Sequence, residues 1–138
     1  MKAVHNVFRN ALSDPQSVIG RVDAGSAAVV DTVAQYYSMV LDFLHAHHGS
    51  EDEIVWPVLL PRCTVEEAAM VSAGEAQHAA VSKHLAASHD ALAAWRAAPS
   101  GAAEKASLIS VFADLRDTLL PHLSYEENHV MPLVRKYL

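Results

Sequence analysis

An apolar helical pattern runs through a histidine and a glutamate in the stretch 43–59, FLHAHHGSEDEIVWPVL. Residues spaced alternately by four and three positions share one face of a helix, and an apolar face of this kind packs in a core. The residues on this face are Val33, Tyr37, Val40, Leu44, His47, Glu51, Ile54 and Val58. A buried carboxylate and imidazole are costly unless they are compensated, and one cation compensates both. The pattern therefore predicts a helix that contributes ligands to a buried cation.

The same pattern recurs near the C-terminus, in the stretch LLPHLSYEENHVMPLV. Aligning His122 on His47 places Glu126 on Glu51. The second apolar face contains Leu108, Phe112, Leu115, Leu119, His122, Glu126, His129 and Leu133. A histidine and a glutamate four positions apart lie one turn apart on the same face of a helix. Two such helices facing each other predict a binuclear metal site.

Size and composition favour a single all-α domain over residues 1–138. The chain is long enough for one core, 51% of its residues are hydrophobic, and it has only 5 glycines, which is typical of a helical bundle. The net charge of -6 argues against a nucleic-acid-binding surface, which requires clustered lysine and arginine. No apolar run reaches the length of a membrane span. The single cysteine, Cys63, cannot form an internal disulfide. We therefore expect a cytoplasmic protein without membrane or nucleic-acid partners.

Turn and capping signals divide the chain into an antiparallel, up-and-down four-helix bundle. The first helix is expected over residues 2–13, followed by a connection over 15–25 with about one helical turn. The second should run from 26 to about 60, with a kink at Pro57. Thr64 and Glu67 form a capping-box pattern for a third helix that lasts to about residue 97. The fourth is expected over 102–137.

The third helix is expected to direct another histidine into the core. Its predicted inward face contains Val71, Glu75, His78, Ser82, Leu85, His89 and Leu92. At about 1.5 Å per residue along each helix, His47, His78 and His122 fall at nearly one level of the bundle. His5 reaches that level only if the connection after the first helix runs along the bundle as extended chain.

These residues resemble the hemerythrin-like, or HHE cation-binding, domains, which are four-helix bundles with a non-haem di-iron centre. The family pattern is one histidine on the first helix, His-x-x-x-Glu on the second and fourth, and His-x-x-x-His on the third. The phrases HHGSEDEIVWP and HLSYEENHVMP are similar to the family's sequence, in which a proline follows the ligand glutamate by six positions. The resemblance covers almost the whole chain. It implies a metal site formed by His5, His47, Glu51, His78, His122 and Glu126.

Imidazole and carboxylate donors without thiolate suit iron or manganese better than calcium, and the family resemblance implies two iron ions, for which Glu51 and Glu126 are the natural bridges. Manganese and zinc are the alternatives. The pattern departs from the family at Ser82, where a second histidine of the third helix would fall. This departure predicts a missing ligand and an open coordination position. We therefore expect chemistry on peroxide or NO rather than oxygen transport, with binding or sensing of O2 or NO and iron handling as the other functions.

Two other structures compete with this interpretation. A ferritin-like di-iron carboxylate site uses Glu-x-x-His twice, and the chain contains Glu75-x-x-His78 and Glu126-x-x-His129. However, no glutamate precedes Glu51 to supply the first helix's carboxylate. The second alternative is a metal-free helical interaction module. The remaining histidines are expected outside the ligand set: His45 and His48 in solvent or beside a ligand, His84 at the surface, His89 in another core layer, and His129 as a neighbour or an extra ligand. The sequence leaves the oligomeric state open.

Overall fold

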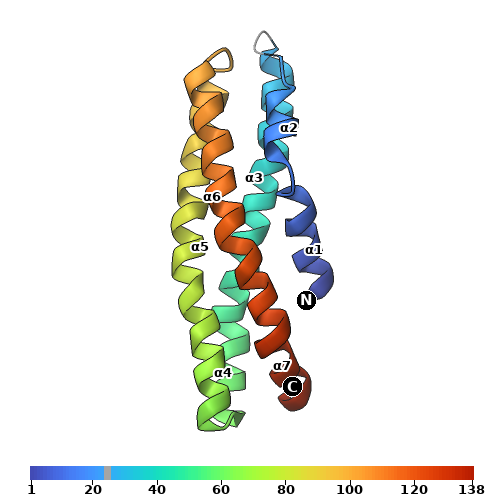
Figure 1. Ribbon diagram of the computed structural model, residues 1–138, viewed down its shortest axis with the longest axis vertical. Helices are drawn as coiled ribbons and strands as arrows, with labels where there is room; N and C mark the ends of the chain where they lie inside the picture. The colour runs from blue at the N-terminus through green and yellow to red at the C-terminus, as the bar shows by residue number, and fades with distance from the viewer. Residues whose placement is uncertain (24–25) are drawn as a thin grey trace.

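The structure is a computed structural model that describes residues 1–23 and 26–138. Its helices form an antiparallel bundle of four columns (Figure 1). The columns are α1 (Lys2–Ala11) with α2 (Pro15–Gly20); α3 (Ala27–Ser50), η1 (Glu51–Val55) and α4 (Trp56–Leu59); α5 (Val65–Ala97); and α6 (Ala102–Tyr125), η3 (Glu126–Val130) and α7 (Met131–Tyr137). A 3-10 turn, η2 (Leu60–Arg62), leads into α5. The all-α four-helix bundle predicted from the sequence is confirmed.

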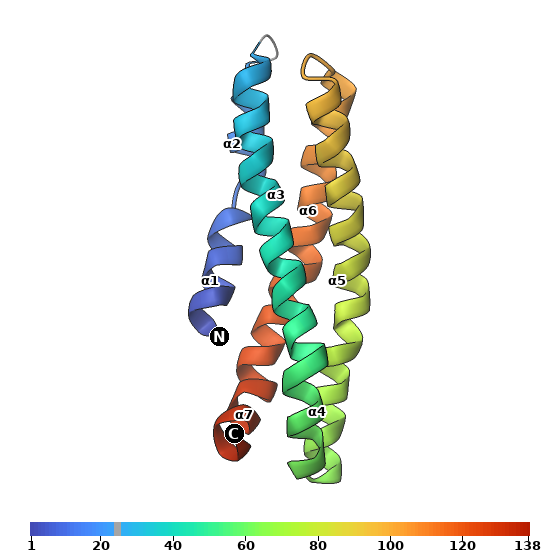
Figure 2. The ribbon, with the colours of Figure 1, turned by 180° about the vertical axis from the view of Figure 1, so that it is seen from behind.

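The first column is broken into two short helices rather than one helix and an extended connection. Asp14 caps α2, because its Oδ1 accepts a hydrogen bond of 3.0 Å from the Ser17 amide, and Pro15 occupies the first turn. The Asp-Pro pair that marks the end of α1 therefore also starts α2, and the connection, predicted with about one helical turn, contains a six-residue helix. Residues 24 and 25 lie outside the described part. Figure 2 shows that α1 begins part-way along the bundle, which brings its first turns to the middle of the molecule.

The second column changes helix type at the glutamate. Residues Glu51–Val55 form a π-turn, in which the Trp56 amide donates to the Glu51 carbonyl five residues earlier. Pro57 has no amide hydrogen and cannot continue regular hydrogen bonding in the next turn. The wider turn shifts every following side chain around the helix axis. The predicted face is therefore correct up to Glu51 and wrong beyond it: Ile54 and Val58 are 63% and 42% exposed, and Trp56 is buried.

The fourth column repeats this feature in η3, where the Met131 amide donates to the Glu126 carbonyl. Pro132 stands at the position of Pro57. Here the π-turn buries Val130 and leaves His129 exposed, whereas Leu133 remains in the core as predicted. The internal repeat of the sequence is thus also a repeat of local backbone geometry.

The third column is one long helix whose start was predicted correctly. The Thr64 side chain accepts from the Glu67 amide at 3.3 Å, and the Thr64 amide donates to Glu67 Oε2 at 2.8 Å, which completes the capping box. The inward face was predicted only in part. Its buried residues are Val71, Gly74, His78, Val81, Leu85, Ser88, Leu92 and Trp95. The neighbouring helices thus lie on the side of Val81 and Trp95. The buried residue after His78 is therefore Val81, three positions later, and not Ser82, four positions later.

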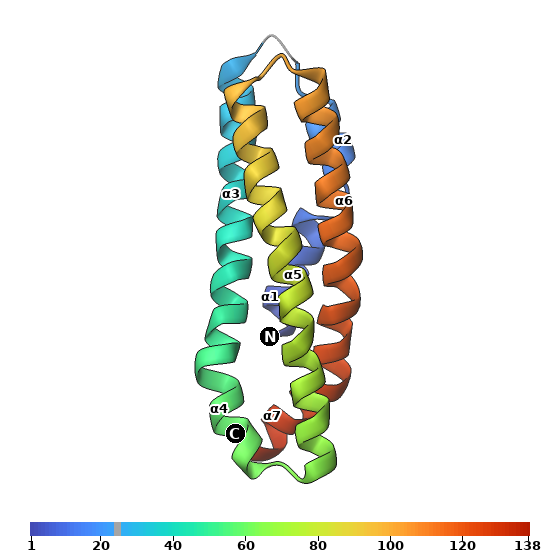
Figure 3. The same ribbon diagram turned by 90° about the vertical axis from the view of Figure 1, so that its left-hand side faces the viewer.

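Within the described residues, the core consists of two apolar clusters. The larger lies among α1, α2, α3, α5 and α6 and includes Phe8, Tyr37 and Phe112. The smaller lies toward the end of the bundle where α4, α5 and α7 meet (Figure 3), and includes Trp56, Val71 and Leu133. The buried histidines and glutamates belong to neither cluster. Among the described residues, no helix is both long and apolar enough to cross a membrane.

Candidate metal centre

All six residues predicted as ligands meet in one buried layer. They come from every column of the bundle: His5 from α1, His47 and Glu51 from α3 and η1, His78 from α5, and His122 and Glu126 from α6 and η3. Each has a relative exposure between 0% and 9%. His5 reaches the layer because α1 starts at its level and not because an extended connection carries it there. The structure thus brings the six residues together, with His5 arriving by a different route than expected, and their role as metal ligands stays a prediction.

Each glutamate places its two oxygens against different imidazoles. Glu51 Oε1 lies 3.5 Å from His47 Nε2, and its Oε2 lies 3.5 Å from His78 Nε2. The second glutamate is contacted more closely. Glu126 Oε2 lies 3.3 Å from His5 Nε2, while its Oε1 lies 3.1 Å from His122 Nε2 and 3.3 Å from His78 Nε2. Both carboxylates thus stand between histidines on opposite sides of the layer.

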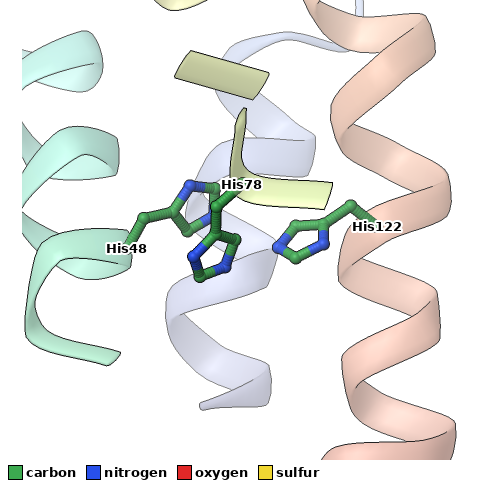
Figure 4. A group of neighbouring side chains, drawn as sticks. All are labelled: His48, His78 and His122. Atoms are coloured by element: carbon green, nitrogen blue, oxygen red, sulfur yellow. The ribbon is translucent and has the colours of Figure 1, made fainter. Parts of the chain in front are cut away.

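A seventh side chain, His48, joins the layer although the sequence analysis placed it outside the ligand set. It is 4% exposed and stacks on His78 with ring centroids 4.1 Å apart and an interplanar angle of 11°. Its ring also lies edge-on to His122 at 5.0 Å. Figure 4 shows the three rings approaching one another from three elements. Adjacent helical residues differ by about 100° in direction, so a pair centred on the inward face can place both members inside the bundle. The sequence signal that could have predicted the position of His48 is therefore its place directly after the inward-facing His47.

Potential ligand atoms form two groups within the described residues. One consists of His48, His78 and His122, and the other of His5, His47, Glu51 and Glu126. In each group, one nitrogen or oxygen per residue lies within 4.8 Å of all the others. Many of these atoms are buried and have no hydrogen-bond partner in the described chain: His5, His47, His48 and His122 Nε2, both oxygens of Glu51, and Glu126 Oε2. Buried polar atoms are normally paired, so this concentration of lone pairs fits a cation.

In three of the histidines, the ring nitrogen that faces away from the layer, Nδ1, lies beside an oxygen acceptor. His5 Nδ1 lies 3.0 Å from Glu127, and His78 Nδ1 lies 2.7 Å from Asp52. His122 Nδ1 lies 3.0 Å from Gln77 Oε1. An acceptor at Nδ1 places the proton there and directs the Nε2 lone pair into the layer, as in metal sites.

The outer acidic residues of the two repeats also contact the buried layer. Asp52 follows Glu51, and Glu127 follows Glu126. Each holds a histidine of another column, and Arg9 Nη1 in turn donates to Glu127 at 2.7 Å.

Comparison with known families agrees with this geometry. The model of the hemerythrin HHE cation-binding domain matches residues 1–135. The chain belongs to this family. No curated protein and no solved structure showed a significant match. The HHE-domain assignment explains why histidine and glutamate, the donors that suit a cation, converge from four columns.

The two glutamates of this HHE domain have opposite electrostatics. Burial, reinforced by the charge of Glu126, raises the pKa of Glu51 to about 9. Burial alone would also raise the pKa of Glu126, but contacts with His122, His5 and His78 outweigh it and lower that pKa. Without a cation, Glu51 is therefore protonated and Glu126 ionised at neutral pH.

Burial also keeps the histidines of the α3 pair neutral. It lowers the pKa of His47 to about 4 and that of His48 to about 2. Burial would lower the pKa of His78 as well, but its hydrogen bonds to Glu126 and Asp52 outweigh burial and raise it. A neutral imidazole is the form that binds a metal.

Several residues weighed in the sequence analysis lie outside the layer. Ser82 is exposed and lines a surface pocket of about 320 Å³ with Asp42, His45 and His89. Ser82 therefore does not face the layer, contrary to its predicted place on the inward face, and the open coordination position stays a prediction. His89, expected in another core layer, is 38% exposed and pairs with Asp42 at 3.5 Å. His84, expected at the surface, is half-buried.

The ferritin-like alternative is also contradicted by the geometry. Its two Glu-x-x-His pairs each require both members to face the site. Glu75 is exposed, and so is His129, whose ring lies 4.6 Å from that of Tyr125. Each pair thus has one member in the layer and one outside it.

Proposed function

We propose that this HHE domain holds a non-haem di-iron centre that binds small oxygen or nitrogen species such as O2, NO or hydrogen peroxide. One observation carries the proposal: each of the two buried glutamates has one oxygen beside an imidazole of each donor group. A carboxylate in this position would bridge two cations, and the imidazoles would complete each one. His5 and His47 would serve one cation, and His78 and His122 the other.

The donor set supports iron over calcium. Imidazole and carboxylate together suit iron, whereas calcium requires oxygen donors alone. Cys63, which could favour a softer metal, lies half-buried in the connection before α5 and packs with the smaller apolar cluster. Bound iron would supply a reducible Lewis acid for a small molecule. The protein's residues would hold the ions, keep the imidazoles neutral and shield the layer from water.

A pocket on the surface reaches the edge of the layer. Its volume is about 420 Å³, and His122, Gln77 and Tyr125 are among its lining residues. A molecule of two to four atoms is far smaller than this pocket. Because Ser82 lies outside the layer, it gives no reason to favour turnover over reversible binding, and we propose binding as the primary function.

The test is the visible absorption spectrum of the iron-loaded protein during titration with azide, NO and hydrogen peroxide. We expect saturable spectral changes with azide and NO at the iron-loaded centre. Glu51→Gln is the matched variant, because it preserves side-chain volume while weakening the bridge, and it should lose these changes. An iron-loaded wild type that responds to none of the three molecules would contradict the binding function. Disappearance of added peroxide at a steady rate would instead establish turnover.

A metal-free interaction module is the competing function. It would leave the buried atoms of Glu51 and the surrounding histidines without partners in every functional state. The free energy cost of such unpaired buried groups, about 1–3 kcal/mol each, argues against it.

A further inference from the structure

His48 extends the proposed centre beyond the ligands that the sequence pattern supplies. Building on the di-iron proposal, we propose that His48 is the third imidazole ligand of one iron, together with His78 and His122. The chain then supplies two consecutive histidines of α3 to two different cations. Their rings diverge as this requires. His47 lies 5.3 Å from the ring of His5, whereas His48 lies 4.1 Å from that of His78.

The nitrogen of His48 is oriented as a donor rather than as a packing residue alone. Its Nε2 is buried without a hydrogen-bond partner in the described chain. One ligand atom from each of His48, His78 and His122 lies within 4.8 Å of the other two. An unpaired nitrogen in a core costs free energy that a hydrocarbon side chain would avoid. A cation would turn this cost into a bond.

The internal repeat provides a comparison at the same position. Aligning His47 with His122 places His48 on Leu123. Leu123 is fully buried and belongs to the larger apolar cluster. The backbone therefore accepts a leucine after the ligand histidine, and packing alone does not require an imidazole there.

The proposal also accounts for Ser82. The family pattern to which the chain is similar has a second histidine on the third helix, at this position. Ser82 is exposed and has no donor in the layer, whereas His48 enters the layer from α3. With His48, the donor group of His78 and His122 contains three imidazoles, one from each of α3, α5 and α6.

His48→Leu tests this role, since it introduces the residue that the second repeat already has. The matched control is His45→Leu, which removes an exposed histidine of the same helix. Each protein is titrated with Fe(II) under anaerobic conditions, and retained iron is counted by elemental analysis after desalting. We expect two irons per chain in the wild type and in the control. The His48 variant should retain one iron and bind the second at least about 10-fold more weakly.

Three outcomes would overturn the assignment. A His48→Leu protein that retains two irons with wild-type affinity would show that His48 only packs against His78, while the di-iron proposal would stand. A folded variant that retains no iron would also overturn it, because the donors of the other group are intact. If the wild type itself retains no iron, the di-iron proposal fails, and this assignment fails with it.

A measurement on the wild type keeps the proposal testable if the variant does not fold. The protein is labelled with nitrogen-15 in histidine, loaded with Co(II), and its paramagnetically shifted histidine side chains are counted by NMR. Coordination by His48 predicts five imidazoles with the large contact shifts of direct cobalt ligands. Four such imidazoles, with His48 shifted only through space, would overturn the assignment.

Discussion

The two repeats share a motif, but the fold places their glutamates in different environments. Both have a histidine, a glutamate four residues later, a π-turn and a proline. Glu126 lies within 3.3 Å of three imidazoles, whereas Glu51 has two imidazole contacts at 3.5 Å and no hydrogen-bond partner in the described chain. Without a cation, Glu126 is ionised and Glu51 is protonated. Neighbouring columns, rather than the local motif, therefore decide the charge of each carboxylate.

The largest expected effect comes from replacing each glutamate by glutamine. Both Glu51→Gln and Glu126→Gln should abolish retention of the iron pair, because each removes a bridging carboxylate. Without metal they should differ. Glu51→Gln should leave the apoprotein's free energy of unfolding nearly unchanged at pH 7, since Glu51 is already neutral there.

Glu126→Gln should destabilise the apoprotein by about 1–3 kcal/mol, because it removes an ionised partner of buried histidines. Urea unfolding of the two metal-free variants measures the difference. Equal stabilities would show that the two glutamates are equivalent and would remove the basis of the comparison.

The π-turn predicts a second contrast within the first repeat. Trp56→Ala should lower the free energy of unfolding by about 3–5 kcal/mol, because the side chain is 1% exposed in the smaller cluster. Ile54→Ala should change the free energy of unfolding by no more than about 0.5 kcal/mol, since the Ile54 side chain lies on the surface. Thermal and urea unfolding measure both. A regular helix without the π-turn would instead make Ile54 the more costly residue to replace.

The outer acids should affect metal binding selectively. Asp52→Asn and Glu127→Gln should each weaken iron binding by about 10- to 100-fold, because they loosen His78 and His5 respectively. The matched control is Glu53→Gln, an exposed acid of the same π-turn. Isothermal titration with Fe(II) gives the affinities. Unchanged affinities in both variants would show that these hydrogen bonds do not position the ligands.

The smallest effect is a pH dependence of the apoprotein. The pKa of Glu51, which faces His47, His78 and Glu126, rises to about 9 on folding from a usual value of 4.5. The folded state therefore binds an extra proton, and stability falls as pH rises through that window. His78, whose pKa is also raised, acts in the same sense as pH rises through its folded pKa. The lowered pKa values of His47 and His48 act oppositely, but only below their usual value of 6.5.

We therefore expect the melting temperature of the metal-free protein to fall by several degrees between about pH 6.5 and pH 9. Glu51→Gln should flatten this decline. In the iron-loaded protein the decline should disappear, since the cation binds the deprotonated carboxylate. A metal-free melting temperature that rises with pH over this window would contradict the assigned protonation of Glu51.

The sequence predicted the parts of the fold that depend on local spacing. The bundle, the capping box at Thr64 and the common level of His47, His78 and His122 followed from helical periodicity and the repeated motif, whereas the complete set of six residues came from the family resemblance. Features that depend on neighbouring columns were missed. A regular helical count cannot include a π-turn, so Ile54 was placed in the core. Periodicity also could not show on which side of His78 the adjacent helices pack, which led to the wrong expectation for Ser82.

His48 shows the same limit within the site. Helical periodicity assigns one inward position to α3 at this level and so selects only one of the adjacent residues His47 and His48. In the structure, α3 has neighbouring helices on both sides of this position, so both side chains enter the layer. The positions of His5, next to His47, and of His78, next to His48, show that each member of the pair faces another potential ligand.

In the proposed di-iron centre, the two donor groups share Glu51 and Glu126 as bridges. Mössbauer spectroscopy of the iron-loaded and oxidised protein, together with the iron content per chain, tests it most directly. The account predicts two irons per chain whose spins are coupled through the shared bridges. A saturated protein with one iron, or with two irons that are magnetically independent, would contradict it.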